Sequence, residues 1–289
     1  MKSIVITGVS TGIGYGAARE FVGHGYRVFG SVRKREDAQR LAAEFGSGFE
    51  PLVFDVTDPE AVRAAAGEVG EALGGALLSG LVNNAGTAIG GPLALQPLGE
   101  VRTHFEVNVV GLVSVTQAFL PLLGMRTPRV EEPGRIVNVG STGGKIAMPF
   151  IGAYAGTKHA VEGISDAMRR ELLPYGIDVV LIEPGAVKTE MWDKGASQAG
   201  RYIDTDYAEP LDRFRRYADG LAKGGFSPEE FGRRVLAVFE KKRPKARYAI
   251  VPGRITHFTL PRLLPDRWLD RLIARNVGLT SAGTEAAGR

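Results

Sequence analysis

The hydrophobic pattern of the chain alternates between short apolar runs and longer stretches in which apolar residues recur at helical spacing. Seven runs rich in Val, Ile and Leu have the length of buried strands of a parallel sheet, at residues 2–7, 26–32, 50–54, 79–82, 135–139, 177–182 and 247–251. Helical spacing is clearest over 59–73, 99–123, 151–173 and 227–241. This alternation predicts an α/β fold: a single doubly wound (Rossmann) domain, with a parallel sheet of about seven strands and helices on both faces.

The predicted organisation places a dinucleotide-binding and catalytic domain at residues 1–250. Within it, residues from about 190 to 226 are polar, aromatic and weakly patterned, so we expect a mobile substrate lid with short helices. Residues 251–289 are expected to form a C-terminal helical extension, interrupted near Pro265, and a tail. The extension could cover the substrate mouth, a subunit contact or a membrane surface, and the sequence leaves these alternatives open.

Composition and charge narrow the classes of function. The 289 residues carry a net charge of +4 and no cysteine, which excludes disulfides and thiolate metal sites, and the four scattered histidines predict no metal site. The basic residues are too dispersed for a nucleic-acid partner. No apolar run reaches the roughly 18 residues of a transmembrane segment. A strand begins close to the N-terminus without a signal peptide, so we expect a cytoplasmic protein.

Three polar side chains near the fifth predicted strand form a candidate catalytic group. Ser141 follows the strand closely, and Tyr154 and Lys158 stand four residues apart on the next predicted helix, so they share one face. A nearby ammonium favours a phenolate by up to ~4 kcal/mol at an effective dielectric of about 20, which would lower the tyrosine pKa toward that of a general acid/base. Ser141 could hold a substrate oxygen beside that hydroxyl. Alternatively, the ring packs, the lysine is solvated and the serine only makes a turn.

A glycine-rich turn between the first strand and the first helix predicts a phosphate-binding site. Glycines let the backbone approach a pyrophosphate, and the helix N-terminus offers free N–H groups and partial positive charge. The spacing is GxxxGxG, and its position in the first strand–helix junction favours ligand binding over a plain turn. The candidate residues are Gly8, Ser10, Thr11, Gly12, Ile13 and Gly14.

The end of the second predicted strand indicates which cofactor to expect. An acidic residue there would bind the 2′-hydroxyl of NAD, whereas this chain has Val32 followed by Arg33, Lys34 and Arg35. A guanidinium suits a 2′-phosphate, so we expect NADP(H) to be favoured over NAD(H), with Arg33 as the selective residue. The alternative is a solvated basic turn that caps the following helix.

Further cofactor-binding candidates lie where other predicted strands end. Asp55 could reach the adenine amine, and the residues at the end of the fourth strand could contact a ribose. Asn83 has an alternative role, in which it only forms hydrogen bonds to neighbouring strands. The turn after the sixth strand would bring the Val187 backbone and the Thr189 hydroxyl near a nicotinamide carboxamide. The candidates at these strand ends are Asp55, Asn84, Ala85, Gly86, Pro184, Gly185, Val187 and Thr189.

Together and in this order, the motifs resemble the short-chain dehydrogenase/reductase family. The matching segments are TGVSTGIG at 7–14, DV at 55–56, NNAG at 83–86, NVVG at 108–111, Ser141, YAGTK at 154–158 and PGAVKT at 184–189. The resemblance implies a catalytic tetrad of Asn108, Ser141, Tyr154 and Lys158. In it Tyr154 is the acid/base, Lys158 holds the nicotinamide ribose and lowers the tyrosine pKa, and Asn108 supports a water relay. The DV match adds Val56 to the cofactor-binding candidates.

Within this family, the sequence GSTGG before the tyrosine and the long tail resemble the 17β-hydroxysteroid and retinol dehydrogenase-like branch, which acts on apolar alcohols and ketones. We therefore expect an NAD(P)-dependent oxidoreductase that interconverts an apolar steroid-, retinoid- or lipid-like alcohol and its ketone or aldehyde. Family members usually form dimers or tetramers, so we expect a homodimer or homotetramer. The alternatives are a 3-oxoacyl-(acyl-carrier-protein) reductase, a non-catalytic dinucleotide sensor, and a membrane-surface enzyme that binds through residues 255–275.

Overall fold

The computed structural model describes residues 1–126, 130–189 and 199–279. Within these ranges a single parallel sheet has the strand order β3-β2-β1-β4-β5-β6-β7. The strands are β1 (Ser3–Ile6), β2 (Arg27–Val32), β3 (Phe49–Val53), β4 (Gly80–Asn83), β5 (Arg135–Val139), β6 (Asp178–Pro184) and β7 (Arg247–Ile250). The predicted doubly wound fold is confirmed, and each predicted strand end lies within two residues of the observed one.

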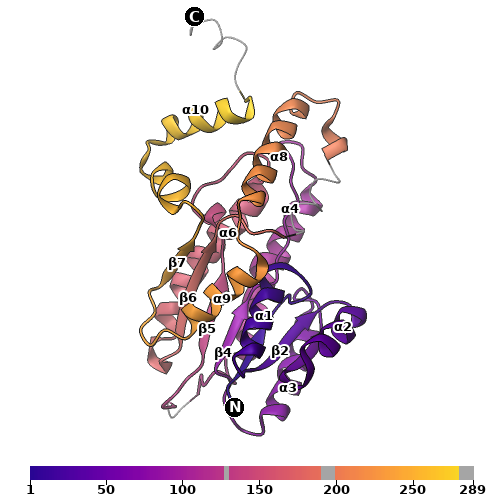
Figure 1. The fold of residues 1–289 in the computed structure, drawn as a ribbon, viewed down its shortest axis with the longest axis vertical. Coiled ribbons are helices and arrows are strands. Elements are labelled where there is room, and N and C mark those ends of the chain that lie inside the picture. Colours follow the sequence, from indigo (N-terminus) through magenta and orange to yellow (C-terminus); the bar gives the residue numbers. More distant parts are fainter. Residues whose placement is uncertain (127–129, 190–198, 280–289) are drawn as a thin grey trace, which may run out of the picture.

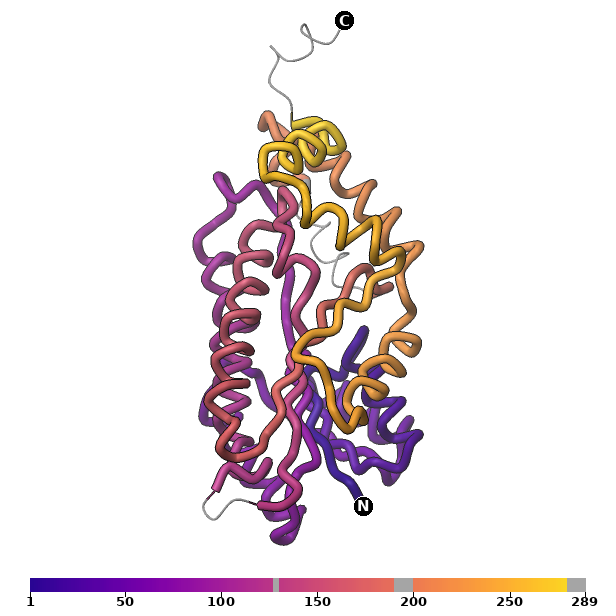
Figure 2. The backbone as a smooth tube through the Cα atoms, turned by 90° about the vertical axis from the view of Figure 1, so that its left-hand side faces the viewer, coloured from indigo at the N-terminus to yellow at the C-terminus, as the bar shows by residue number. Residues whose placement is uncertain are grey.

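Helices cover both faces of the sheet (Figure 1, Figure 2). On one face α1 (Gly12–Gly23), α2 (Arg35–Phe45) and α9 (Pro228–Phe239) pack in one apolar cluster with the strands. The other face carries α3 (Pro59–Leu73), α5 (Gly111–Phe119) and α6 (Gly152–Glu171). Because helices lie on both sides, the inner strands β1, β2, β4, β5 and β6 are mostly buried, which explains their continuous apolar runs, whereas the edge strands β3 and β7 are partly exposed.

The helices α1 and α9 touch through their backbones. A Cβ on Gly16 would lie 1.9 Å from the carbonyl oxygen of Pro228, and one on Gly232 would lie 2.2 Å from the carbonyl oxygen of Gly16. Ser227 begins α9 with a reciprocal cap, in which its hydroxyl accepts from the Glu230 N–H and the Glu230 carboxylate accepts from the Ser227 N–H. The position of α1 behind the first strand–helix turn is therefore fixed by a helix from the far end of the chain.

The long helix predicted at 99–123 consists of three successive pieces. These are α4 (Leu98–Phe105), a π-helical turn (Glu106–Val110) and α5. The π-helical turn contains Asn108, so the structure interrupts the helix at the residue that broke the apolar pattern. Single π-helical turns inside helices are frequent at functional sites, because the extra residue redirects a side chain.

The upper end of the molecule in Figure 1 is built by residues after β6. It contains a 3₁₀ turn (Ala199–Tyr202), α8 (Ala208–Lys223), a π-helical turn (Ile255–Thr259), a 3₁₀ turn (Pro261–Leu263) and α10 (Asp266–Val277). Residues 190–198 of the predicted lid lie outside the described part. Within the described residues of the lid, the prediction of short helices is wrong for 208–223, where α8 runs for 16 residues. Its i,i+4 ion pairs, Arg213 with Glu209 and Arg216 with Asp212, support this longer helix.

The extension after β7 is helical and interrupted next to Pro265, as predicted, with α10 beginning at the following residue. No helix among the described residues is both long and apolar enough to cross a bilayer. The same residues contain no group of three or more His, Asp or Glu side chains placed to hold a metal ion.

Candidate active site

A hollow of about 390 Å³ opens at the carboxyl edge of the sheet, where the strand order reverses between β1 and β4. Open α/β sheets bind their ligands at this position, because helices on the two faces diverge there. The turns after β1 to β6 and the first part of α6 form its walls. Most predicted site residues line it, namely Gly8, Ser10, Thr11, Gly12, Ile13, Arg33, Asp55, Val56, Asn84, Ala85, Gly86, Ser141, Tyr154, Lys158, Pro184, Gly185, Val187 and Thr189.

The predicted glycine turn has the shape of a phosphate cradle. Gly8 and Gly12 have φ angles of 69° and 61°, which side chains other than glycine rarely adopt. Gly14 does not line the hollow, and a Cβ on it would lie 2.1 Å from the Gly8 carbonyl oxygen. Thr11, the residue before α1, makes no side-chain cap, so the first N–H groups of the helix are left for a ligand. These residues fit a dinucleotide pyrophosphate.

Hydrogen bonds between neighbouring strand ends hold this cradle. The Gly8 N–H donates to the Ser31 hydroxyl at 3.0 Å. The Thr7 hydroxyl accepts from the N–H groups of Asn84 and Ala85 at 2.9 and 3.0 Å, and the Asn84 amide donates to the Thr7 carbonyl at 2.9 Å. The turn after β1 and the turn after β4 are thereby locked together, so both walls of the hollow keep a fixed separation.

Asn83 has the alternative, structural role. Its buried amide donates to the Asn138 side chain at 2.9 Å and to the Thr116 hydroxyl at 2.8 Å. It therefore joins β4 to β5 and α5 and does not line the hollow.

At the outer end of the hollow, Arg33 is exposed at the carboxyl end of β2. The neighbouring Asp55 carboxylate accepts from the N–H and the hydroxyl of Thr57 at 2.9 and 2.8 Å, which fixes its orientation. Arg40 on α2 donates to the Ser10 carbonyl at 2.9 Å and pairs with Asp37. An exposed guanidinium at the rim fits a phosphate on a ribose better than it fits a hydroxyl.

Ser141, Tyr154 and Lys158 converge at the inner end of the hollow. The Lys158 ammonium lies 5.7 Å from the centre of the Tyr154 ring, and both side chains are buried. The Lys158 ammonium donates to the Val139 carbonyl at 2.9 Å, so it is fixed at the end of β5. The Ser141 hydroxyl is hydrogen-bonded to the Tyr154 side chain and accepts from the Gly143 N–H at 3.0 Å. A strand end and the next helix thus place three polar groups together.

The acid–base properties of these residues differ from the sequence expectation. Burial raises the pKa of Tyr154, and the Ser141 hydrogen bond lowers it by less. Burial also lowers the pKa of Lys158 to about 8. Removal from water disfavours phenolate and ammonium alike, so the lysine does not offset the burial of the phenol. The predicted lowering of the tyrosine pKa is therefore absent from the protein alone.

Asn108 lies one layer behind the hollow and does not line it. Its buried amide donates to the Thr87 carbonyl at 2.9 Å and to the Thr157 hydroxyl at 3.0 Å, and its oxygen accepts from the Thr87 N–H at 2.8 Å. Thr87 lines the hollow and Thr157 precedes Lys158, so the π-helical turn positions two neighbours of the site. The water relay stays a prediction.

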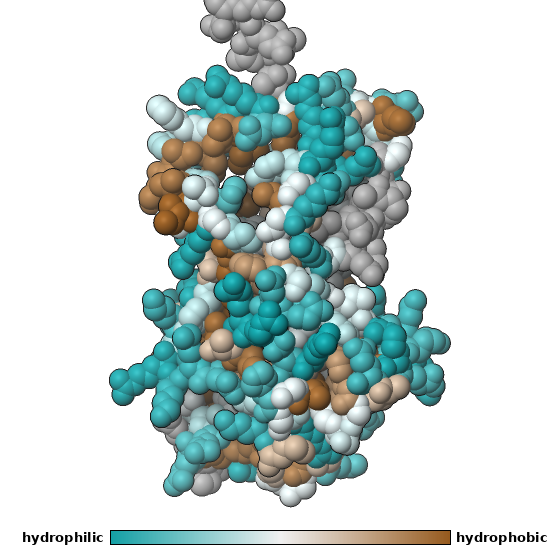
Figure 3. All heavy atoms as spheres, viewed as in Figure 1, coloured by the Kyte–Doolittle hydropathy of each residue, from teal (hydrophilic) through white to brown (hydrophobic). Residues whose placement is uncertain are grey.

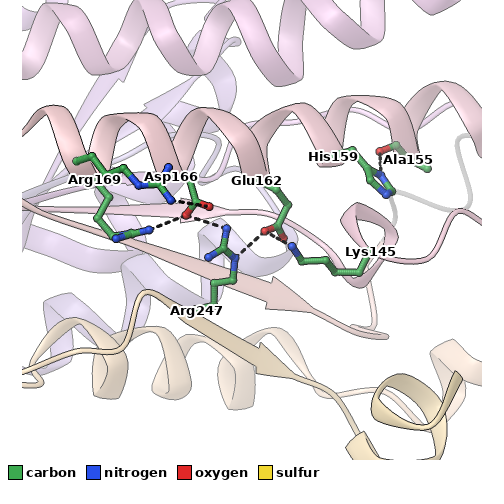
Figure 4. Close-up of polar contacts among 8 residues, drawn as sticks. Lys145, Ala155, His159, Glu162, Asp166, Arg169 and Arg247 are labelled. Atoms are coloured by element: carbon green, nitrogen blue, oxygen red, sulfur yellow. Dashed lines mark hydrogen bonds and ion pairs between the residues drawn. The ribbon is translucent and has the colours of Figure 1, made fainter. Parts of the chain in front are cut away.

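A carboxyl pair that the sequence analysis missed lies beside the catalytic group. Glu183, next to Pro184 on β6, and Glu162, one helical turn after Lys158 on α6, are both buried. Glu162 binds Lys145 at 2.7 Å and Arg247 at 2.8 Å (Figure 4). Burial and the neighbouring Glu162 raise the pKa of Glu183 to about 7. Protonated Glu183 then donates to Glu162, which matches the absence of any other partner for one oxygen of each carboxyl among the described residues.

Several uncharged residues of the wall were also not predicted from the sequence. These residues share a position, either in the segment that follows a strand or in a helix that faces the carboxyl edge of the sheet. They do not share a reactive group. They are Ser31, Val32, Phe54, Thr87, Ala88, Ile89, Thr103, Val107, Val139 and Gly140.

Comparison with known proteins agrees with this site. A family model described as short chain dehydrogenase matches residues 2–200. The NADPH-dependent 3-dehydrocapnine reductase of Ornithobacterium rhinotracheale is 42% identical over 277 residues, covering 96% of this chain and 98% of that protein. An uncharacterized oxidoreductase of Escherichia coli K12, YbbO, is 35% identical and covers 94% of each chain.

Among solved structures, an actinorhodin polyketide ketoreductase variant with NADPH aligns with a TM-score of 0.72 and 29% identity. That alignment covers 89% of this chain and 98% of the ketoreductase. The motifs, the hollow at the strand-order reversal and these relatives agree. The chain belongs to the short-chain dehydrogenase/reductase family and is an NAD(P)-dependent oxidoreductase.

Proposed function

We propose that the protein reduces the ketone of an apolar molecule with NADPH, and catalyses the reverse oxidation when the alcohol is supplied. The observation that carries this proposal is the pair of hydroxyls, Ser141 and Tyr154, at the inner end of a hollow whose outer end carries Arg33. The NADPH dependence of the reductase from Ornithobacterium and the NADPH complex of the ketoreductase support the choice of cofactor.

The chain's own residues have distinct roles in this proposal. The glycine turn and the N-terminus of α1 would hold the pyrophosphate, and Arg33 the 2′-phosphate. The cofactor, when bound, supplies or accepts the hydride. Ser141 orients the substrate oxygen, and Tyr154 donates a proton to it. Because burial raises the pKa of Tyr154, the phenol is protonated at neutral pH, which suits an acid in the direction of reduction.

Apolar substrates are favoured by the surroundings of the phenol. Tyr154 belongs to a buried apolar cluster with Phe150 and Ile151, which immediately precede α6, Phe214 from α8 and Val277 from α10. This cluster extends from the catalytic helix to the upper end of the molecule. The steroid, retinoid and long-chain lipid ketones of the predicted branch are the classes to compare, in a panel assayed with both cofactors.

Removal of the phenol tests the catalytic assignment. Tyr154→Phe should lower kcat by at least about a hundredfold, because general acid catalysis is lost while the ring still packs. NADPH binding, followed by fluorescence titration, should be retained. Turnover close to that of the unaltered protein would contradict the role of Tyr154.

Replacement of Arg33, at the outer end of the hollow, tests the preference for NADPH over NADH. Arg33→Asp should shift the ratio of kcat/KM for NADPH over NADH by roughly a hundredfold toward NADH, because a carboxylate repels the 2′-phosphate and can bind the ribose hydroxyl. Lys34→Asp is the matched control, since Lys34 does not line the hollow. An unchanged ratio in the Arg33 variant would show that another residue selects the cofactor.

We also propose that the protein is cytoplasmic and forms a homodimer or homotetramer. Phe105 in α4 and Val110 in the adjoining π-helical turn are exposed by 39% and 49%, which would suit a subunit contact on that side. Light scattering and cell fractionation test these two points. A single-chain mass in solution would remove the oligomer.

A carrier-protein-bound substrate is the second candidate, since the chain is similar to a polyketide ketoreductase. Docking of an acidic carrier would need a free basic face near the lid. On α8, however, Arg213, Arg215 and Arg216 each pair with Glu209 or Asp212. These pairs reduce the positive charge available to a carrier, so we rank this candidate below a free apolar ketone.

A further inference from the structure

Exposed apolar side chains gather in one short part of the C-terminal extension. Of the 18 exposed large hydrophobic residues among the described residues, six fall within 255–272, namely Ile255, Leu260, Leu263, Leu264, Trp268 and Leu272. Trp268 is 65% exposed and Leu263 is 75% exposed. Figure 3 shows hydrophobic side chains gathered at the upper left of the molecule, over this extension, with hydrophilic ones beside them. Apolar side chains in one continuous patch mark a surface that another molecule covers.

The extension holds itself to the body with few side chains. Within 254–277, only Phe258 and Val277 are buried. Along α10, Ile273 and Val277 face inward, where α10 packs on α8, whereas Trp268 and Leu272, one turn apart, face outward. Among the residues that the structure describes, the outward stripe therefore contributes little to packing.

Arginines surround the outward stripe. Residues 254–275 contain five arginines and two aspartates, a net charge of +3. Arg267, Arg271 and Arg275 follow one another at intervals of four, so they form a row beside Trp268 and Leu272. The one ion pair of this segment within the described residues joins Arg267 to Asp270 at 3.6 Å, and both side chains are largely exposed. The row thus keeps most of its positive charge.

We propose that this face, residues 254–275, docks on the surface of a lipid bilayer that contains anionic headgroups. Trp and Leu enter the interface, and the long arginine stems let guanidinium groups reach the phosphates above them. The charge argues against a second copy of the chain as the occupant. A two-fold contact would bring like arginine rows together.

Docking of residues 254–275 would also bring a second hollow, which borders α10, close to the bilayer. This hollow, of about 470 Å³, lies between α10 and the segment leading into α6, with Ile273 and Ala274 on one wall and Met148 and Phe150 on the other. Phe150 belongs to the apolar cluster around Tyr154. An apolar ketone could therefore leave the bilayer close to the site; this last step rests on the proposed function.

Vesicle co-sedimentation of the full chain tests the docking. We expect binding to vesicles of phosphatidylcholine with phosphatidylserine, weakening as salt is added, and much less binding to phosphatidylcholine alone. The fluorescence of Trp268 should shift to the blue on binding, and Trp268→Phe should remove that shift.

Charge reversal provides a matched pair of variants. Arg267→Glu, Arg271→Glu and Arg275→Glu together should weaken binding by at least roughly a hundredfold, because each lost arginine near an anionic surface costs about fivefold and the new carboxylates add repulsion. Lys241→Glu, Lys242→Glu and Arg243→Glu make the same change of charge in the exposed loop before β7, at the opposite edge of the sheet. This control should lose far less affinity. Trp268→Ser with Leu272→Ser should lose binding to both vesicle types.

Three results would overturn the proposal: no sedimentation with anionic vesicles, equal losses in the two charge-reversed variants, or dissociation of a dimer by the α10 changes without any vesicle binding. Light scattering detects the last result, which would make the face a subunit contact. Turnover of a small water-soluble ketone should be unchanged in every variant, which also shows that the variants fold. Failure of the unaltered protein to reduce any ketone of the panel, small or apolar, would instead contradict the proposed function.

Discussion

The two ends of the hollow are built in opposite ways. At the cofactor end, backbone meets backbone: Gly14 touches the Gly8 carbonyl, and behind it Gly16 and Gly232 join α1 to α9. Beyond the substrate end, α10, which does not line this hollow, is attached through a few apolar side chains, and much of its surface is exposed. A rigid end suits a ligand of constant shape. A loosely packed end suits a ligand, or a surface, whose shape the catalytic residues do not define.

The largest expected effect is on the free energy of unfolding, when one aromatic residue from each end is replaced by alanine. Phe231 on α9 is fully buried in the main cluster, so Phe231→Ala should lower the free energy of unfolding by about 3–5 kcal/mol. Phe214 on α8 lies in the small upper cluster, so Phe214→Ala should cost only about 1–2 kcal/mol while raising KM for an apolar ketone. Urea unfolding and steady-state kinetics give both quantities. Equal losses of stability would contradict the difference in packing between the two ends.

A smaller effect is expected when a methyl group is added at Gly14, where the helix backbone closely approaches the Gly8 carbonyl. Gly14→Ala should lower the free energy of unfolding by about 1–3 kcal/mol and weaken NADPH binding, because its methyl group would overlap the Gly8 carbonyl. Gly67→Ala, in α3, is the control: no atom lies within 4 Å of the added Cβ, so stability should stay level or rise by up to about 1 kcal/mol. Normal cofactor binding by the Gly14 variant would show that the turn can relax.

The smallest effect concerns the carboxyl pair between the two ends. The pKa of Glu183 is raised to about 7 from its usual 4.5, so the folded protein holds more protons than the unfolded chain between these values. Stability contributed by protonated Glu183 is therefore present at pH 4.5 and lost as pH rises through 7. Glu183→Gln should remove this loss, on the order of 1 kcal/mol at pH 8, because an amide can still donate to Glu162.

Thermal unfolding of both proteins at pH 5 and pH 8 measures that difference. The charged groups that face Glu183, namely Glu162, Lys145 and Arg247, are unchanged in the variant and cancel in the comparison. If the stability difference between the two proteins is the same at both pH values, Glu183 does not titrate in this window.

The strands and the glycine turn lie where the sequence predicts them, because their signals are local. Buried parallel strands require apolar runs, and the turn with Gly8 and Gly12 requires residues that accept positive φ. The convergence of Ser141, Tyr154 and Lys158 followed from the strand–turn–helix order and the four-residue spacing. Each of these features depends on residues that are neighbours in the chain.

Other features could not be predicted, because they join distant residues. The pairing of Glu183 with Glu162 depends on how α6 crosses β6, and neither residue carries a local signal of a partner. The pKa of Tyr154 is raised by burial, and that burial depends on segments that are distant in the chain. The length of α8 was missed because its polar residues are held by ion pairs along the helix rather than by an apolar pattern.

The contact of Gly16 with Gly232 has a consequence for how the protein is made. While the ribosome is still adding residues beyond 200, the segment that becomes α9 has not yet been synthesised, and the face of α1 that it covers is bare. The glycine turn at residues 8–14 can therefore gain the support of α9 only after residues 228–239 have been made. A nascent chain released before that point would keep the whole turn and still hold α1 less firmly behind it.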